Sequence, residues 1–106
     1  MPILQINLKL NVPAESYVAN CRKVAGAIAN VEGLLWKIWI LNEDAGEAGG
    51  IYCFDTEDSL NNYVAGPIVS GLKQNPAVTV VSMKKFDVVE DLTRVTRGTM
   101  TTRSAA

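Results

Sequence analysis

Two charged side chains near the middle of the chain, Lys37 and Glu47, are the candidates for acid–base chemistry. An amine or a carboxylate does such work at neutral pH when its surroundings shift its pKa. Because no perturbing partner is evident beside either residue, an ion pair between strands or subunits is the competing interpretation. Asn7 can orient a ligand, or it can belong to a polar row that is solvated or lies in an interface. The sequence predicts no complete catalytic constellation.

Aromatic residues form a second candidate group, which would bind a flat apolar ring. They lie in the same region of the chain and are Trp36, Tyr52, Phe54 and Tyr63. Trp36 and Tyr52 belong to two short apolar runs that a polar turn at residues 42–46 joins, which is the pattern of a β-hairpin. The alternative interpretation is that these rings fill an ordinary core, since aromatic side chains dominate many cores.

Metal and cofactor sites are not indicated. The chain has no histidine, the commonest metal ligand and general base, and its two cysteines, Cys21 and Cys53, are isolated in apolar contexts. Glycines 46, 49 and 50 lie at the hairpin without a helix start after them, so they do not form a phosphate loop. The prediction is therefore two free thiols and no metal, flavin or haem.

The elements that must position these residues begin with an alternating segment at residues 3–11, which predicts a half-buried strand. Pro13 and Glu15 then open a helix that Gly33 ends. Its apolar stripe contains Val18, Cys21, Ala25 and Ile28. The hairpin follows, with strands near residues 34–42 and 47–55.

A second helix begins at Asp55 or Thr56, and Gly66-Pro67 interrupts it before a short helical piece at residues 68–74. Residues 77–89 are rich in β-branched residues and predict the last strand. The order β-α-β-β-α-β predicts an α+β ferredoxin-like fold, with a four-stranded antiparallel sheet and both helices on one face. The domain would span residues 1–90, and residues 91–106 would form a polar tail.

The hairpin register decides which side chains share a face. Pairing Leu41 with Glu47 puts Trp36 opposite Tyr52 on a nearly all-apolar face, which we assign to the helices. The other face carries Lys37, Trp39 and Glu47, and with Asn7 it is mixed. We assign that face to a homodimer interface, because no helix of this chain is left to cover it. A slip of one residue would reverse the strand at residues 34–42 relative to its partner.

Composition narrows the class of partner. The apolar fraction of 48% is high for a domain of 106 residues and suggests surface covered by a second subunit. The net charge of −1 gives no case for nucleic acid or an acidic membrane, and no run approaches the length of a membrane span. Without an export signal we expect a cytoplasmic protein. Arg94, Arg97 and Arg103 make the tail basic, so we expect it to pack on the acidic body of a partner subunit.

The chain resembles monooxygenases of the YdhR type. The resemblance rests on GLLWKIW at residues 33–39 and EAGGIYCF at residues 47–54. It continues through Ser59 and Tyr63 in the second helix and FDV at residues 86–88. It implies a dimeric α+β barrel and kinship with small oxygenases that oxidise polycyclic phenols without metal, flavin or haem. Haem-degrading proteins of this fold use a histidine iron ligand, which this chain cannot supply.

The resemblance implies a cofactor-independent monooxygenase acting on an aromatic or polyketide-like hydrophobic substrate. Trp36 and Tyr52 would bind the ring, and Lys37 or Glu47 would take a proton if its side chain reaches the pocket. Two alternatives stay open: a non-catalytic dimeric module that binds a hydrophobic metabolite, and an isomerase or lyase, since one fold hosts several chemistries.

Overall fold

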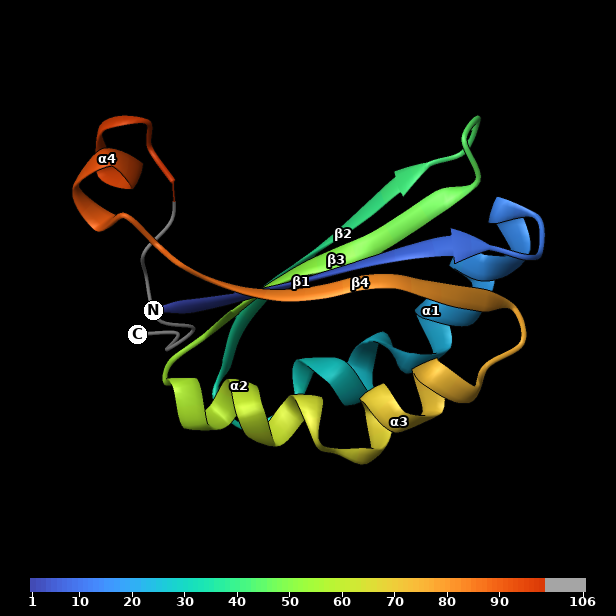
Figure 1. Cartoon of the computed structure of the whole chain (residues 1–106), viewed down its shortest axis with the longest axis horizontal. Helices are drawn as coiled ribbons and strands as arrows, with labels where there is room; N and C mark the ends of the chain where they lie inside the picture. Colours follow the sequence, from blue (N-terminus) through green and yellow to red (C-terminus); the bar gives the residue numbers. More distant parts are fainter. Residues whose placement is uncertain (99–106) are drawn as a thin grey trace.

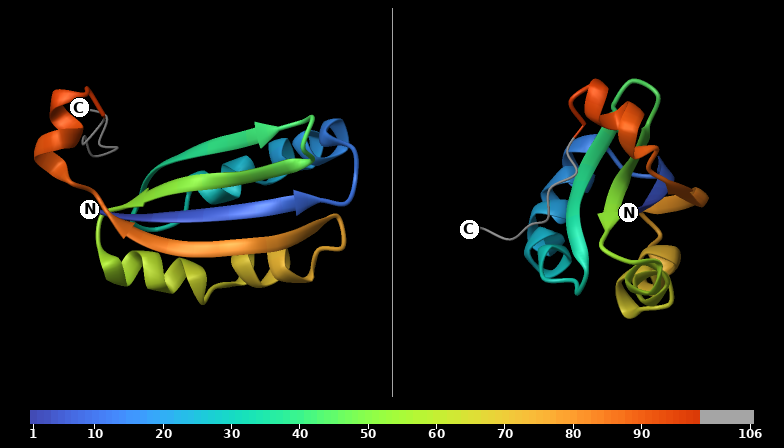
Figure 2. Two further views of the ribbon diagram at one scale, coloured as in Figure 1. Left: turned by 45° about the horizontal axis from the view of Figure 1, so that its top comes forward. Right: turned by 90° about the vertical axis from the view of Figure 1, so that its left-hand side faces the viewer.

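The computed structural model describes residues 1–98, in which helices cover one face of a four-stranded antiparallel sheet (Figure 1). The strands are β1 (Pro2–Leu10), β2 (Leu34–Asn42), β3 (Glu47–Phe54) and β4 (Val78–Asp87). The helices are α1 (Ala14–Ala29), α2 (Glu57–Val64), α3 (Pro67–Gln74) and α4 (Glu90–Val95). The sheet order is β2-β3-β1-β4, so the predicted ferredoxin-like fold is confirmed. Figure 2 shows α1 and the α2–α3 pair on the same face.

Strand β1 follows the predicted alternation. Leu4, Ile6 and Leu8 are at most 4% exposed and point to the helices, whereas Lys9 is exposed. The strand occupies the middle of the sheet, pairing with β3 on one side and β4 on the other. The alternation of β1 therefore defines the two faces of the whole sheet: one is covered by the helices and the other is open.

The second helical stretch is divided as the sequence predicted. Thr56 caps α2, and its hydroxyl oxygen accepts a hydrogen bond from the Ser59 backbone N–H at 3.1 Å. The stretch breaks after Val64, and Pro67 takes the first position of α3, where its missing N–H costs no helical hydrogen bond. The break lets two short helices follow the twist of the sheet.

The predicted hairpin register is wrong by one residue. Asn42, not Leu41, pairs with Glu47, because the turn holds four residues rather than five. The Asn42 side-chain oxygen accepts the Ala45 backbone N–H at 3.2 Å, and Gly46 takes a positive φ of 66°. Trp39 consequently pairs with Gly50, not Gly49. Because side chains alternate, this slip exchanges the faces of β2 relative to the prediction.

A bulge near the start of β2 limits the error. The register shifts between Leu34 and Trp36, so Leu34 pairs with Phe54 and is 4% exposed. Leu34 thus faces the helices as predicted. Beyond the bulge Lys37 pairs with Tyr52, and these two share the helix-covered face, while Trp36 pairs with Cys53 on the open face.

The core lies between the sheet and the α2–α3 pair. Its centre is Phe54, which is fully buried, with ring centroids 6.3 Å from Tyr52 and 5.6 Å from Tyr63. Leu60 and Val69 from the helices are also 0% exposed. Helix α1 contributes differently, because Ile28 is its single buried residue among those described. This helix is therefore less closely packed than the predicted stripe implied.

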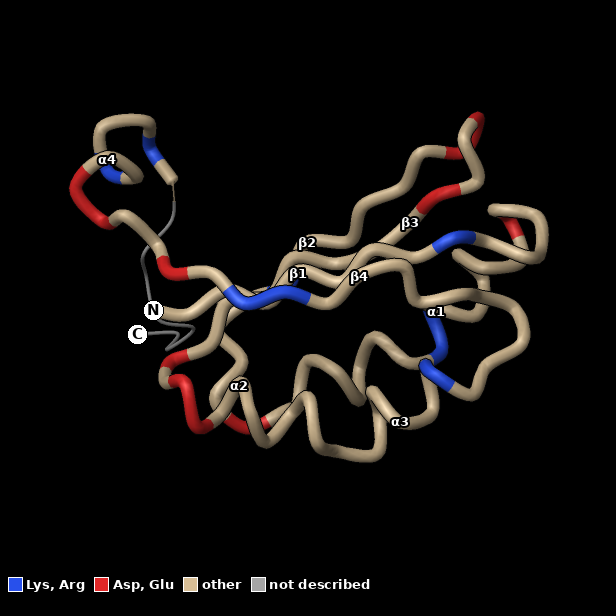
Figure 3. The backbone as a smooth tube through the Cα atoms, in the orientation of Figure 1, with Lys and Arg blue, Asp and Glu red and all other residues tan. Residues whose placement is uncertain are grey.

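Figure 3 marks the charged positions along the backbone: acidic positions lie on α2, on α4 and at the turn between β2 and β3, and a basic stretch lies on β4. The first turn of α2 is acidic, and Lys85 of β4 approaches it, with its amine 3.7 Å from a Glu57 carboxylate oxygen and 3.3 Å from the Asn61 side-chain oxygen. Both charged groups are exposed, so their ion pair contributes about 0–1 kcal/mol to the free energy of unfolding. No helix within residues 1–98 is long and apolar enough to cross a membrane.

Helix α4 stands away from the sheet at the end of β4 (Figures 1 and 2). The sequence predicted a polar tail here, and the structure forms one short helix, which exposes Leu92 by 63% and Val95 by 75%. A guanidinium nitrogen of Arg94 lies 3.9 Å from a carboxylate oxygen of Glu90 in the same helix. Residues 99–106, with Arg103, lie outside the described residues. Packing of the tail on a partner subunit stays a prediction.

Candidate functional site

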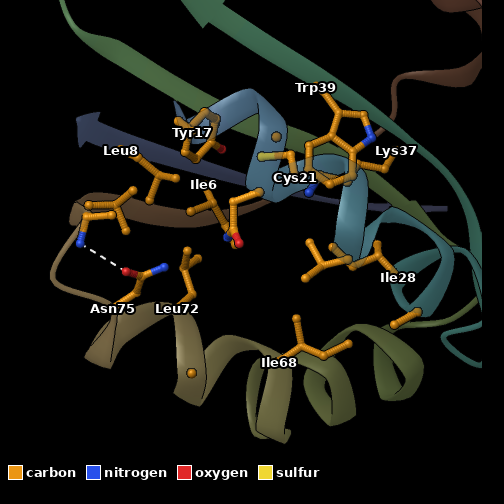
Figure 4. A pocket seen from close by; sticks show the side chains of 18 of the residues that line it. Ile6, Leu8, Tyr17, Cys21, Ile28, Lys37, Trp39, Ile68, Leu72 and Asn75 are labelled. Carbon is orange, nitrogen blue, oxygen red and sulfur yellow. Dashed lines mark hydrogen bonds between the residues drawn. The ribbon is translucent and has the colours of Figure 1, made fainter. Parts of the chain in front are cut away.

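A cavity of about 550 Å³ lies between the sheet and the helices (Figure 4). Its volume is within the range of small-molecule sites. Strands β1, β2 and β3 form one wall, α1 a second, and α2 and α3 the third. The lining is mostly apolar, with Ile6, Leu8, Val24, Ile28, Ile68 and Leu72 around it.

The cavity exists because two elements leave space. Strand β3 has Gly49 and Gly50 at the wall, where other strands would project side chains. A Cβ at Gly50 would lie 2.6 Å from Cε of Lys37 and 3.0 Å from Cε1 of Tyr52. The glycine therefore makes room for the lysine stem. Opposite it, α1 presents Tyr17, Cys21 and Val24 to the cavity rather than packing them into the core.

Lys37 is the central polar group of the cavity. Its Nζ lies 3.3 Å from the Trp39 ring centroid and 4.6 Å from the Tyr52 ring centroid, so the amine is held between two aromatic faces. Burial lowers its pKa from 10.5 to about 8. No carboxylate lines the cavity, and Lys37 makes no ion pair within residues 1–98. The amine thus has aromatic neighbours but no anionic partner there.

Three phenols and a thiol also belong to the polar lining, together with Ser16, Asn20 and Asn75. Tyr63 donates a hydrogen bond to the Tyr52 hydroxyl at 3.4 Å, and burial raises the pKa of both phenols. On α1, burial and the neighbouring Cys21 thiol raise the pKa of Tyr17. These phenols stay protonated at neutral pH and can donate hydrogen bonds to a ligand oxygen. The arrangement can therefore bind a flat apolar body and meet its oxygen with an amine and hydroxyl groups.

The sequence-predicted aromatic residues are only partly brought together. Tyr52 and Tyr63 line the cavity, whereas Phe54 lies behind them in the core. Trp36 is not at the cavity: it faces the open side of the sheet, with its indole nitrogen buried and unpaired within residues 1–98. The prediction that Trp36 lines this pocket is wrong, because it depended on the slipped register.

The predicted interface residues also divide. Lys37 and Trp39 lie in the cavity, so their assignment to the open face is wrong for the same reason. Glu47 and Asn7 remain together on the open face, where they line a separate hollow of about 240 Å³ with Val81. Asn7 donates a hydrogen bond to the Ser82 hydroxyl at 2.9 Å. Of the two acid–base candidates, the cavity therefore contains Lys37 and not Glu47.

Sequence reasoning missed Tyr17 and Trp39 as cavity residues. Tyr17, Cys21, Val24 and Ile28 recur at helical spacing, which is the signal that could have identified this face of α1. The predicted stripe used Val18 instead and missed the tyrosine. For Trp39 the pattern contained no independent signal, since its face depends on the register alone.

Comparisons with known proteins agree on the fold. The family described as "Putative mono-oxygenase ydhR" matches residues 3–99. A putative antibiotic biosynthesis monooxygenase from Deinococcus radiodurans is 16% identical, with 85% of this chain and 94% of that chain covered and a TM-score of 0.68. No curated protein sequence matches the chain.

Two further solved structures are similar to this chain. A variant of SnoaB, a cofactor-independent oxygenase from Streptomyces nogalater, is 16% identical over 84% of this chain and 94% of that chain, with a TM-score of 0.62. The heme-degrader MhuD from Mycobacterium tuberculosis, with two hemes bound, is 18% identical to this chain. The match covers 82% of this chain and 95% of that chain, with a TM-score of 0.62. At these identities the likeness concerns the fold alone.

Proposed function

Because this chain belongs to the mono-oxygenase family ydhR, we propose that its cavity oxygenates an aromatic, polyketide-like substrate without a cofactor. The observation that carries the proposal is the Lys37 amine, held between two aromatic rings in an apolar cavity to which residues 1–98 contribute no carboxylate. Such an amine can accept a proton from a phenol or an enolisable ketone. The ammonium that forms then pairs with the oxyanion that its own proton transfer created.

The lysine, the aromatic residues and the apolar wall of the cavity have separate roles in this proposal. Lys37 is the proton acceptor, Trp39 binds the flat ring beside it, and the apolar wall excludes water from the anion. The Tyr52–Tyr63 pair and Tyr17 supply hydroxyl donors to the substrate oxygens. The lowered pKa of Lys37 increases the fraction of neutral amine at neutral pH, which is the form that takes the proton.

The redox chemistry balances without another electron donor. In a substrate of the anthrone type, the deprotonated carbon gives its electrons to dioxygen and forms a carbon–oxygen bond. The methylene becomes a carbonyl, one oxygen atom stays in the product, and the other leaves as water with both methylene hydrogens. The protein supplies binding, deprotonation and a dry environment.

Oxygen uptake tests the proposal. We expect a panel of anthrones and hydroxylated naphthalenes to include substrates that consume dioxygen with the purified, chelator-treated protein, and the quinone product to appear in equal amount. Binding of the same compounds without oxygen uptake would contradict the oxygenase proposal and favour the non-catalytic binding module. The apolar cavity is compatible with that second function, because binding needs no proton acceptor.

We also propose that the protein is a two-fold homodimer whose open sheet faces pack together. The open face exposes Ile38 and Phe86 by 50% each and Val81 by 66%, and no helix within residues 1–98 covers it. A stable interface of this kind buries roughly 2,000 Å² or more. We expect a dimer by light scattering at micromolar concentration, and a monomer would contradict this proposal.

The tail is proposed to pack on the partner subunit in that dimer. Leu92 and Val95 expose apolar surface that α4 cannot bury against its own body. Removal of residues 92–106 is therefore expected to weaken the dimer and lower its melting temperature. Sedimentation at decreasing concentrations measures the first effect and calorimetry the second. Unchanged values in both experiments would mean that the tail has no partner in solution.

A pair of tryptophan substitutions tests where the ring binds. We expect Trp39→Ala to weaken binding of 2-naphthol by roughly tenfold, since it removes an aromatic wall of the cavity. Trp36→Ala is the matched control, because Trp36 lies on the same strand but faces away from the cavity. The affinity of the Trp36→Ala variant for 2-naphthol should stay within about twofold of the wild-type affinity. Calorimetric titration measures both, and a larger loss for Trp36→Ala would contradict the assignment.

A further inference from the structure

The six lysines of this chain are not equivalent. Lys37 is half-buried and faces the cavity, whereas the other five are exposed: Lys9, Lys23, Lys73, Lys84 and Lys85. An exposed lysine is hydrated and protonated, and it is a weak nucleophile at neutral pH. A lysine that is desolvated in an apolar pocket is the kind that forms imines with carbonyl compounds. Position alone therefore distinguishes Lys37 as a nucleophile.

We propose that Lys37 captures aldehydes carried on an aromatic body, forming a reversible imine inside the cavity. The proposal uses the cavity of the proposed function but does not require any reaction with oxygen. It gives the protein a second activity, the covalent binding of an aryl aldehyde. The ligand class follows from the site, because Trp39 and Tyr52 flank the amine with ring faces and the surrounding wall is apolar.

The covalent step balances within the site. The lone pair on Nζ adds to the carbonyl carbon while the carbon–oxygen π bond opens, and a proton moves from nitrogen to oxygen to give the carbinolamine. The nitrogen lone pair then forms the carbon–nitrogen double bond as the remaining carbon–oxygen bond breaks. The oxygen takes up a proton and leaves as water, and the nitrogen gives up its second proton. No oxidant or reductant takes part. Loss of water needs a proton donor, and the Tyr17, Tyr52 and Tyr63 hydroxyls at the cavity supply donors that stay protonated at neutral pH.

Burial, and not a neighbouring charge, favours the neutral form of Lys37. Helix α1 presents Tyr17 and Cys21, β3 presents Tyr52, and α2 presents Tyr63. The parts of β1 and α3 at the cavity present no charged side chain. Burial lowers the pKa of Lys37 to about 8, with a smaller opposing effect from Cys21. At pH 7.5 its neutral fraction is then about 200-fold that of an ordinary lysine.

Reductive trapping of 2-naphthaldehyde tests the proposal on the wild-type protein. The protein is incubated at pH 7.5 with the aldehyde and cyanoborohydride, which converts an imine to a stable secondary amine, and peptide mapping locates the label. A weaker base is also a weaker nucleophile, so we expect Lys37 to be labelled at least about tenfold faster than the mean of the other lysines. Excess 2-naphthol should slow the labelling of Lys37 alone.

Variants add a second readout. Lys37→Arg keeps a cation but has no nucleophilic amine, so it should lose the fast label, while Lys23→Arg, at an exposed position of α1 outside the cavity, should keep it. Far-ultraviolet dichroism checks that both variants are folded. Labelling of Lys37 at or below the rate of the other wild-type lysines would overturn the proposal. Fast labelling without oxygen uptake by any substrate would keep the proposal and remove the proposed oxygenase function.

Discussion

Substitution of Lys37 by methionine is expected to lower kcat for oxygen consumption by about 10²–10³-fold. Methionine keeps much of the length and apolar character of the lysine stem but cannot accept a proton. The loss should be larger for substrates that hold their proton more tightly, because a substrate that ionises by itself needs no base. Steady-state oxygen uptake with two substrates of different acidity measures this difference.

The pH profile of the same experiment has a predicted direction. Burial lowers the pKa of Lys37 to about 8, so the neutral amine becomes available as the pH rises through that value. We expect kcat/KM of the wild type to rise with pH and to reach half its maximum near pH 8. Lys23→Met, at an exposed position of α1 outside the cavity, is the matched control and should keep wild-type kinetics. An unchanged profile in Lys37→Met would contradict the assignment of Lys37 as the base.

Phe54→Ala is expected to lower the free energy of unfolding by about 3–5 kcal/mol. The Phe54 side chain is 0% exposed, and its ring packs against Tyr52 and Tyr63, with centroid distances of 6.3 Å and 5.6 Å. Truncation removes these contacts and leaves a cavity that the rigid sheet cannot close. Urea unfolding followed by dichroism measures the change.

Val24→Ala serves as the comparison for this loss. Val24 lines the cavity but is 40% exposed, and alanine is the better helix former, so we expect a loss below about 1 kcal/mol. Equal losses at the two positions would mean that Phe54 is not the centre of the core. A Phe54→Ala protein that stays as stable as the wild type would contradict the packing described above.

The architecture was predictable because several local signals agreed. The alternation around Leu4, Ile6 and Leu8 predicted a half-buried strand, and Gly66-Pro67 predicted the division of the second helical stretch. Each signal acts over a few residues, through side-chain periodicity or backbone sterics. The order of the elements then left the ferredoxin-like sheet as the known solution.

The face of β2 was not predictable in the same way. Both faces of this strand are rich in apolar residues, so its pattern fits either register equally well. The decision is made at the turn, where the Asn42 side chain accepts the Ala45 N–H and shortens the loop to four residues. That single hydrogen-bonded turn moves Lys37 and Trp39 into the cavity and Trp36 out of it.

The cavity itself was hard to predict from the sequence. Two adjacent glycines in β3 were interpreted as hairpin residues, although Gly50 provides the space that the Lys37 stem occupies. Helix α1 was expected to pack closely, yet Ile28 is its one buried residue among those described. Empty volume depends on how far two elements stand apart, and no local pattern encodes that distance.

The most direct test of the central claim is an NMR titration of the Lys37 amine, assigned by comparison with Lys37→Arg. We predict a pKa near 8 in the free protein, because burial disfavours the charged form. Binding of 2-naphthol as its anion should raise that pKa, since a neighbouring oxyanion favours the ammonium. An ordinary pKa near 10.5 that does not change with 2-naphthol would contradict the account.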